Sequence, residues 1–166
     1  MRSTNDSSQQ VVDLPPGKVD EIDKALIREL QNNGRKSYAD LAPLVGLSQA
    51  AVRKRVSRLI DSGTIQIVAV TNPLALGFNI MTMIGVRVEG DIKIKSVAEA
   101  LADLPQVSYV AVTTGRFDVL VEAVCGDQEQ LFELLDDDIR SIPGVRGTEA
   151  FTYLKLEMQT YAWGTR

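Results

Sequence analysis

One stretch, from Ser37 to Ile65, constrains the fold and the role of this chain more than any other. It predicts two short helices joined by a tight turn at Gly46-Leu47-Ser48, where Gly46 permits a left-handed backbone and Ser48 caps the second helix. That second helix carries four cationic side chains within six residues: Arg53, Lys54, Arg55 and Arg58. Two helices around a glycine-containing turn, the second of them basic, are typical of a helix-turn-helix that binds DNA.

The residues before this motif complete a predicted three-helix domain over residues 19–63. A first helix is expected to begin at an Asp20 cap, with Asp23 in the third helical position. It is expected to end at Asn33-Gly34 in a left-handed conformation.

The second helix is expected to start after Ser37, with Asp40 in the place of the capping-box acid. Pro43 lies past the first turn, so this helix should be short and either kinked or 3₁₀-like there. The third helix should end at Ser62-Gly63. Helical spacing predicts that the last two helices bury Leu41, Leu44, Val45, Val52, Val56, Leu59 and Ile60.

Three segments are predicted to lie outside the two folded domains. Residues 1–18 should form a disordered tail, or an arm that contacts DNA or a partner subunit, because their apolar surface is too small to offset the entropy of ordering. Residues 64–78 should form a linker, in which Ile65–Val70 predicts a strand that serves as a wing. Residues 161–166 should form a C-terminal tail.

Residues 79–160 alternate between strand and helix patterns. Strands are expected over residues 79–89, 107–113, 118–125 and 147–159. Helices are expected over residues 97–104, capped by Ser96, and from an Asp127 cap to about residue 141. The order β-α-β-β-α-β predicts a ferredoxin-like sandwich, in which two helices cover one face of an antiparallel sheet, so the whole chain is of the α+β class.

The other face of this sheet is predicted to be too apolar to remain in water. Its expected side chains include Met81, Met83, Val110, Val112 and Leu120. A second copy of the same sheet would cover them, so we expect a homodimer.

Composition narrows the possible functions. The chain has no histidine and a single cysteine, Cys125, which argues against histidine-dependent catalytic triads and structural zinc sites. Residues 20–63 hold eight basic and six acidic side chains, whereas residues 64–166 hold eight basic and fourteen acidic ones, so polyanion binding is expected of the first half only. No apolar run reaches the ~18 residues of a membrane helix, and no signal peptide is apparent, so we expect a cytoplasmic protein.

Several motifs together resemble the leucine-responsive/asparagine-synthase-C regulator family (Lrp/AsnC) of prokaryotic transcription factors. The matching pieces of the first half are residues 19–23 (VDEID), 26–27, 30–35 (LQNNGR), 41–42, 45–48 (VGLS), 52–59 (VRKRVSRL), 63–65 and 72–77. In the second half, Thr114-Gly115-Arg116-Phe117-Asp118 is similar to the signature of the family's sensor domain. The resemblance spans about residues 19–160 and departs from the family pattern at Pro43 and in the longer N-terminal tail.

This resemblance implies an N-terminal helix-turn-helix and a C-terminal sensor domain. It also implies dimers, often assembled into tetramers or octamers, with an amino acid or a related small effector bound between sensor domains. No cofactor or metal is implied, and the run Asp136-Asp137-Asp138 is interpreted as a solvated helix face.

The predicted contacts with double-stranded DNA fall into two groups. The N-terminal part of the third helix offers side chains for base edges in the major groove: Gln49, Arg53, Lys54 and Ser57. Phosphates are expected to be bound by Arg58, Arg35, Lys36 and the helix cap Ser37.

The second candidate site is the segment around Gly115. It is either a hairpin turn, with Gly115 at positive φ and Asp118 as a cap, or an effector pocket. In a pocket, backbone groups freed at Gly115 would bind the carboxylate of an amino acid and Asp118 its ammonium group. Thr148 and Thr152 of the last strand would complete it from a neighbouring subunit.

These expectations favour a sequence-specific transcriptional regulator that is not an enzyme. Two alternatives stay open. One is an enzyme on the same architecture, similar to haem-precursor decarboxylases, although such chemistry would be expected to use histidine. The other is an architectural protein that compacts DNA with little sequence preference.

Overall fold

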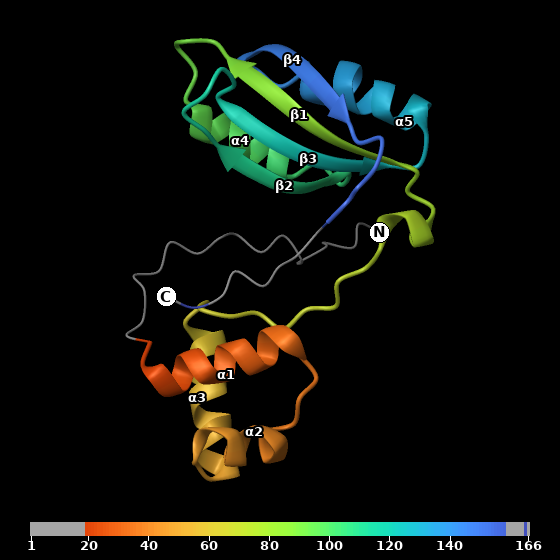
Figure 1. Cartoon of the computed structure of the whole chain (residues 1–166). Helices are drawn as coiled ribbons and strands as arrows, with labels where there is room; N and C mark the ends of the chain where they lie inside the picture. The colour runs from red at the N-terminus through yellow and green to blue at the C-terminus, as the bar shows by residue number, and fades with distance from the viewer. Residues whose placement is uncertain (1–18, 159–164, 166) are drawn as a thin grey trace, which may run out of the picture. The chain divides into compact units, whose positions relative to one another are not determined.

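The computed structural model describes residues 19–158 and residue 165, in which two compact units are distinguished. One unit extends to Val70 and the other from Thr71 to Glu157 (Figure 1). The first unit is helical, with α1 (Glu21–Asn32), α2 (Tyr38–Val45) and α3 (Gln49–Asp61). The predictions for the tail at residues 1–18, and for most of the tail at residues 161–166, lie outside the described residues.

The start of α1 is fixed by a capping box. The Asp20 carboxylate accepts a hydrogen bond from the Asp23 backbone N–H at 2.8 Å, and the Asp23 carboxylate accepts one from the Asp20 N–H at 3.2 Å. The left-handed end expected at Asn33-Gly34 is wrong, because Asn33 is extended with φ −151°. Its side-chain oxygen accepts the Arg35 N–H at 3.0 Å, which is an alternative way to turn the chain.

The turn between α2 and α3 forms as predicted. Ser37 Oγ accepts the Asp40 N–H at 3.1 Å at the start of α2, and Gly46 ends α2 with φ 67° and ψ 30°. Ser48 Oγ then accepts the Ala51 N–H at 3.3 Å and caps α3. α2 is short, as expected, but it stays α-helical through Pro43 rather than becoming 3₁₀. The helix ends two residues later, so few backbone bonds depend on the missing N–H.

The helical unit has its own apolar core. It is built from Leu26, Leu30, Leu41, Ala42, Val52 and Val56. Two residues expected in it are exposed instead: Leu44 by 55% and Ile60 by 40%. At 100° per residue, Ile60 lies at the edge of the stripe formed by Val52, Val56 and Leu59.

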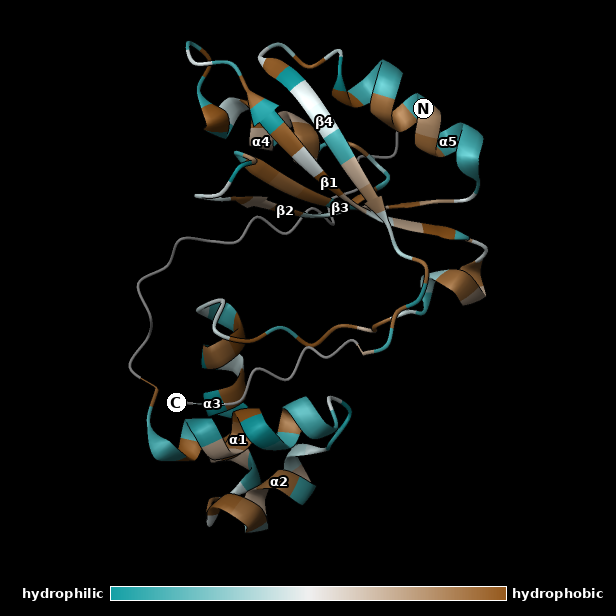
Figure 2. Ribbon diagram, turned by 45° about the horizontal axis from the view of Figure 1, so that its top comes forward, coloured by the Kyte–Doolittle hydropathy of each residue, from teal (hydrophilic) through white to brown (hydrophobic). Residues whose placement is uncertain are grey.

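The strand expected over residues 65–70 is wrong. These residues are described, and they contain no regular secondary structure. Ile65 packs against the helical core, whereas Ile67, Val68 and Val70 are exposed, and Figure 2 shows this coil as largely hydrophobic where it leaves α3. A strand needs a neighbour for its backbone hydrogen bonds, and no described segment pairs with this one. The linker instead forms a 3₁₀ helix, η1 (Pro73–Leu76), that ends at Gly77 with φ 88°.

The second unit is the predicted βαββαβ sandwich. Its strands are β1 (Ile80–Val88), β2 (Val107–Val112), β3 (Val119–Cys125) and β4 (Val145–Thr152). They form one antiparallel sheet in the order β2-β3-β1-β4. Its helices α4 (Ile94–Ala102) and α5 (Gln128–Glu133) lie on one face of that sheet (Figure 1). The α5 helix continues into a π-helical segment, η2 (Leu134–Ile139).

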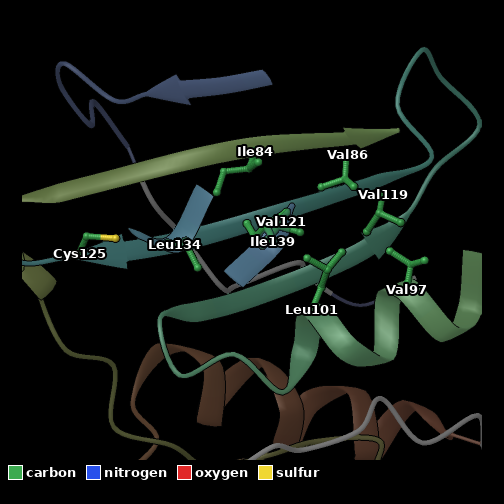
Figure 3. Close-up of a cluster of buried hydrophobic side chains, with 10 residues drawn as sticks. Ile84, Val86, Val97, Leu101, Val119, Val121, Cys125, Leu134 and Ile139 are labelled. Atoms are coloured by element: carbon green, nitrogen blue, oxygen red, sulfur yellow. The ribbon is translucent and has the colours of Figure 1, made fainter. Parts of the chain in front are cut away.

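The core of this unit lies between the sheet and its helices. Figure 3 shows Val97 and Leu101 of α4 near side chains of the strands. The residues that are buried here include Ile84, Val86, Val119, Val121, Leu134 and Ile139. Each such side chain contributes about 1.5–3 kcal/mol of transfer free energy when it is fully buried.

Several predicted boundaries in this unit are corrected by the structure. α4 begins at Ile94 rather than residue 97, and Ser96 is not its cap but donates from Oγ to the Lys93 carbonyl at 2.8 Å. The last strand ends at Thr152, well before residue 159. Asp127 is the predicted cap of α5, because its carboxylate accepts the Gln130 N–H at 2.9 Å.

Pairing register corrects the composition of the helix-free sheet face. Val110 and Val112 were expected on the open face, but this is wrong. They pair with Val121 and Val119, which are buried under the helices, so both valines lie on the helix side. A register shift between Val107 and Tyr109 changes the alternation of β2 and places Tyr109 opposite Glu122. The open face therefore carries Met81, Met83, Tyr109, Leu120 and Phe151.

A close approach on this open face requires glycine. A Cβ atom built at Gly85 would lie 2.5 Å from ring carbons of Phe117, which packs over β1. We expect Gly85→Ala to lower the free energy of unfolding by about 1–3 kcal/mol, because the ring cannot retreat without losing its packing. Denaturant unfolding measures this change. Gly90→Ala is the control, since a Cβ there meets nothing within 4 Å, and equal stability of the two variants would contradict the expectation.

Candidate nucleic-acid interface

The outward side of α3 presents the side chains predicted for base contacts. Gln49, Arg53 and Lys54 are exposed and Ser57 is half-buried. Among the residues that the structure describes, Arg53 and Lys54 form no ion pair, so both charges are available to a polyanion. An exposed basic helix edge of this kind fits the major groove of duplex DNA.

One residue next to this surface was missed by sequence reasoning. Tyr38, the first residue of α2, lies under the Arg53 guanidinium, whose central carbon is 6.0 Å from the ring centroid. This contact brings the Arg35–Ser37 segment beside the outer flank of α3. An aromatic residue directly after the Ser37 cap was the available signal, and a cation over the face of a tyrosine ring is attracted by it.

The other two cations of α3 face a buried carboxylate. Asp23 has 0% exposed side-chain surface and accepts from Arg55 Nη1 at 2.9 Å and from Arg58 Nη2. Arg55 also donates to Asp20 at 2.6 Å. Arg58 nevertheless keeps 54% of its side chain exposed, so it is attached to the fold and open to solvent at once.

This network shifts the pKa values of Asp20 and Arg55. The Asp23 backbone N–H and the Arg55 guanidinium lower the pKa of Asp20, and hydrogen bonds to Asp20 and Asp23 raise the pKa of Arg55. Because the Asp20 pKa is lowered in the folded state, its stabilising contribution is present above the ordinary pKa of about 3.9 and is lost as the pH falls through the folded value.

The remaining phosphate candidates lie between α1 and α2. Arg35 is exposed, and its backbone N–H is the donor to Asn33. Lys36 Nζ donates to Glu29 Oε2 at 2.5 Å, so its charge is partly neutralised within the domain. Ser37 Oγ donates to Asp40 at 2.6 Å while it caps α2.

The candidate effector residues occupy different parts of the second unit. Gly115 is exposed in the loop between β2 and β3, and among the described residues it is not one of the glycines at positive φ, contrary to the turn interpretation. Asp118 accepts the Val88 N–H at 2.8 Å.

Thr148 pairs with Val86 and Thr152 with Thr82, so register directs both threonines to the helix-bearing face. Four residues of strand separate them by about 13 Å. Only Thr148 therefore shares an end of the sheet with Asp118, whose N–H donates to Val86.

The open sheet face combines aromatic rings with paired charges. The rings of Phe117 and Phe151 meet edge to face with centroids 6.2 Å apart, and the Arg116 guanidinium lies 4.7 Å from the Phe117 centroid. Arg116 is ion-paired with Glu149. Tyr153 donates its hydroxyl to Glu122 at 2.9 Å. An apolar surface with few unpaired charges is suited to association with another protein surface.

Three further findings concern the thiol, metal sites and membrane spans. Burial raises the pKa of the Cys125 thiol, which disfavours the reactive thiolate. Within residues 19–158 and 165 no cluster of carboxylates or cysteine is arranged to hold a metal ion. No helix among these residues is long and apolar enough to cross a membrane.

The Tyr153–Glu122 hydrogen bond has a measurable consequence. Burial and the Glu122 carboxylate raise the pKa of Tyr153 to about 12. Since the ordinary value is about 10, this group stabilises the fold below pH ~10, and the contribution is lost as the pH rises through 12. Absorbance titration of tyrosinate should show a late phase that Tyr153→Phe removes and Glu122→Gln moves to lower pH. A late phase that survives in Tyr153→Phe would contradict this assignment.

Family models match both parts of the chain. Residues 19–60 match an AsnC-type helix-turn-helix domain. Residues 78–166 match a C-terminal dimeric alpha+beta barrel domain of AsnC-type regulators.

Curated relatives and solved structures agree with these matches. The HTH-type transcriptional regulator FL11 of Pyrococcus horikoshii is 36% identical over 143 residues, which cover 86% of this chain and 93% of that protein. Ptr1 of Methanocaldococcus jannaschii is 30% identical, with 89% and 97% covered.

Escherichia coli AsnC superimposes with a TM-score of 0.75 at 25% identity, with 85% of this chain and 95% of AsnC covered. The Neisseria meningitidis regulator NMB0573, solved with L-Met, superimposes with a TM-score of 0.77 at 25% identity, with 86% and 94% covered.

The fold and the basic helix define a helix-turn-helix regulator with a separate ferredoxin-like domain. With two family models and these relatives, the chain belongs to the Lrp/AsnC family of transcriptional regulators.

Proposed function

We propose that this protein is a homodimeric regulator that places α3 in the major groove of duplex DNA and reads base edges with Gln49, Arg53, Lys54 and Ser57. The observation that carries the proposal is that Arg53 and Lys54 are exposed and form no ion pair with any described residue. The Ser48 cap and the Asp23 ion pairs support it, because they fix the start and the flank of α3. The protein then acts by binding rather than by catalysis.

Two copies are needed for useful specificity. A single helix reads only a few base pairs, and a two-fold dimer reads a pseudo-palindromic site. The open sheet face supports dimerisation through this unit, since Met83, Leu120 and Phe151 lie on it. The match of residues 78–166 to a dimeric domain points the same way. In this arrangement Arg35, Lys36, Ser37 and Arg58 contact phosphates.

Substitution of the two unpaired cations tests the DNA interface. Arg53→Ala and Lys54→Ala should each cost about 1–3 kcal/mol of discrimination between the preferred duplex and a mixed-sequence duplex. Fluorescence anisotropy with a duplex selected by the wild-type protein from a random library provides the measurement. Lys95→Ala in α4 removes the same charge from an exposed site and should leave affinity nearly unchanged. Undiminished binding by both α3 variants would remove α3 as the reading helix.

The same titrations separate specific regulation from DNA compaction. A specific regulator keeps a large affinity ratio between the two duplexes at physiological salt, because base contacts do not depend on counterion release. An architectural protein would show nearly equal affinities.

The second unit is proposed to bind an amino acid or a related small effector. The loop residues Gly115 and Asp118 support this, because the Asp118 carboxylate accepts the Val88 N–H at the end of β1. Thr148 and Thr152 of a neighbouring subunit are proposed to complete the pocket. The L-Met complex of the Neisseria regulator supports the chemical class of ligand. Binding that favours one assembly over another would change DNA affinity through linkage.

Calorimetry with a panel of amino acids tests the effector site. At least one should bind with measurable heat, and Asp118→Asn should weaken it about tenfold because a charged hydrogen bond to the ammonium group is lost. Asp137→Asn is the matched control, since Asp137 is exposed on η2. Absence of heat for every amino acid would contradict the proposal for this unit and leave the DNA interface untouched.

A further inference from the structure

The carboxylate of Asp23 in α1 links this helix to α3 through ion pairs with Arg55 and Arg58. Its Oδ1 accepts from Arg55, and its Oδ2 accepts from Arg58 and from the Asp20 backbone N–H. A carboxylate without solvent contact needs such partners, because an unpaired buried charge is strongly unfavourable. Both oxygens of Asp23 are therefore committed within the domain.

The two arginines held by Asp23 differ in what else they can do. Arg55 donates to both Asp20 and Asp23 and keeps only 27% of its side chain exposed. Arg58 has Asp23 as its ion-pair partner among the described residues and stays 54% exposed. A guanidinium carries five N–H groups, and the hydrogen bond to Asp23 comes from Nη2. Most of the donors of Arg58 thus remain for another anion.

The position of Arg58 on the helix decides where those donors point. At 100° per residue, Arg58 lies between Arg55 on the flank and Lys54 on the outward side of α3. It therefore lies at the margin of the surface that faces DNA in the proposed function, where the sugar-phosphate backbone borders the major groove.

We propose that Asp23 is a positioning residue for phosphate binding: it holds Arg58 through Nη2, so that the remaining N–H groups of this guanidinium contact one DNA phosphate. Asp23 itself touches no DNA. A free surface arginine loses rotamer freedom when it binds phosphate, whereas Arg58 is already held before DNA arrives. This inference rests on the proposed docking of α3 in the major groove.

A double-mutant cycle tests the coupling. Asp23→Asn, Arg58→Ala and the double variant are compared by anisotropy on the selected duplex and on a mixed-sequence duplex over a range of salt concentrations. Arg58→Ala should weaken binding about tenfold on both duplexes and reduce the salt slope by ~0.9, the value for one phosphate contact. Asp23→Asn should weaken binding several-fold and add no further loss in the Arg58→Ala background.

Whether Asp23→Asn weakens or strengthens DNA binding distinguishes a positioning role of Asp23 from a purely electrostatic or structural one. Removal of a negative charge near DNA should by itself strengthen binding, and Asp61→Asn, at an exposed site at the end of α3, measures that effect. Tighter binding by Asp23→Asn with a steeper salt slope would show that Asp23 withholds Arg58 from DNA and would overturn the proposal. Additive losses in the double variant would also overturn it, because Asp23 would then act through the fold rather than through Arg58.

Circular dichroism melts establish that each variant is folded at the assay temperature. If Asp23→Asn does not fold, Arg58→Lys provides the test. Lysine keeps the charge, but it lacks the planar set of guanidinium N–H donors that can bind a carboxylate and a phosphate at the same time. Its salt slope should equal that of the wild type while its affinity falls several-fold, and wild-type affinity would overturn the proposal. A different combination is that Arg53→Ala loses discrimination between the two duplexes while the losses of Asp23→Asn and Arg58→Ala simply add. That combination would support the proposed function and reject only this inference.

Discussion

The helical unit depends on one buried negative charge. Asp23 is fully inaccessible to solvent, and the capping box of α1 and the two flanking arginines of α3 all converge on it. Directional bonds from Arg55 and Arg58 to one carboxylate restrict the rotation of α3 about its axis in addition to the hydrophobic packing of its buried stripe. The rotation of α3, and with it the set of side chains that point outward, is therefore coupled to the first turn of α1.

A second constraint acts in the α+β unit. Its sheet buries Ile84, Val86 and Val121 under the helices, and the opposite face remains apolar. Phe117 crosses this open face, lies over Gly85 and meets Phe151 at its edge. Near these rings Arg116 is ion-paired with Glu149, and the Glu122 carboxylate accepts a hydrogen bond from the Tyr153 hydroxyl. Both contacts lower the free-energy cost of covering these charged groups with another protein surface.

Much of the fold could be predicted because it is specified locally. The caps at Asp20, Ser37, Ser48 and Asp127 all form, since each side chain satisfies a backbone N–H only a few residues away. The order of strands and helices also follows from periodicity within single segments. Two local predictions failed, the Ser96 cap and the left-handed end at Asn33-Gly34. Other predictions failed where a partner segment was needed. Residues 65–70 have strand composition but no described neighbour, and the β2 register shift moved Val110 to the helix side.

The candidate DNA site shows the same division. Helical spacing placed Lys54 and Ser57 opposite the apolar stripe of α3 and Gln49 and Arg53 on one flank, because the buried stripe fixes the orientation of the helix. Helical spacing could not predict the ion pair between Arg58 and Asp23 or the contact between Tyr38 and Arg53. The partners in these contacts are 35 and 15 positions apart in the sequence. The helix-turn-helix, the βαββαβ order and the basic outer edge of α3 follow from the order of the amino acids, because they depend on short-range bonds and on burial patterns within one element. Three features instead depend on contacts between segments far apart in the chain, so they became visible in the fold. These are which cations of α3 form no ion pair with described residues, which sheet face each strand residue joins, and the requirement for glycine at position 85.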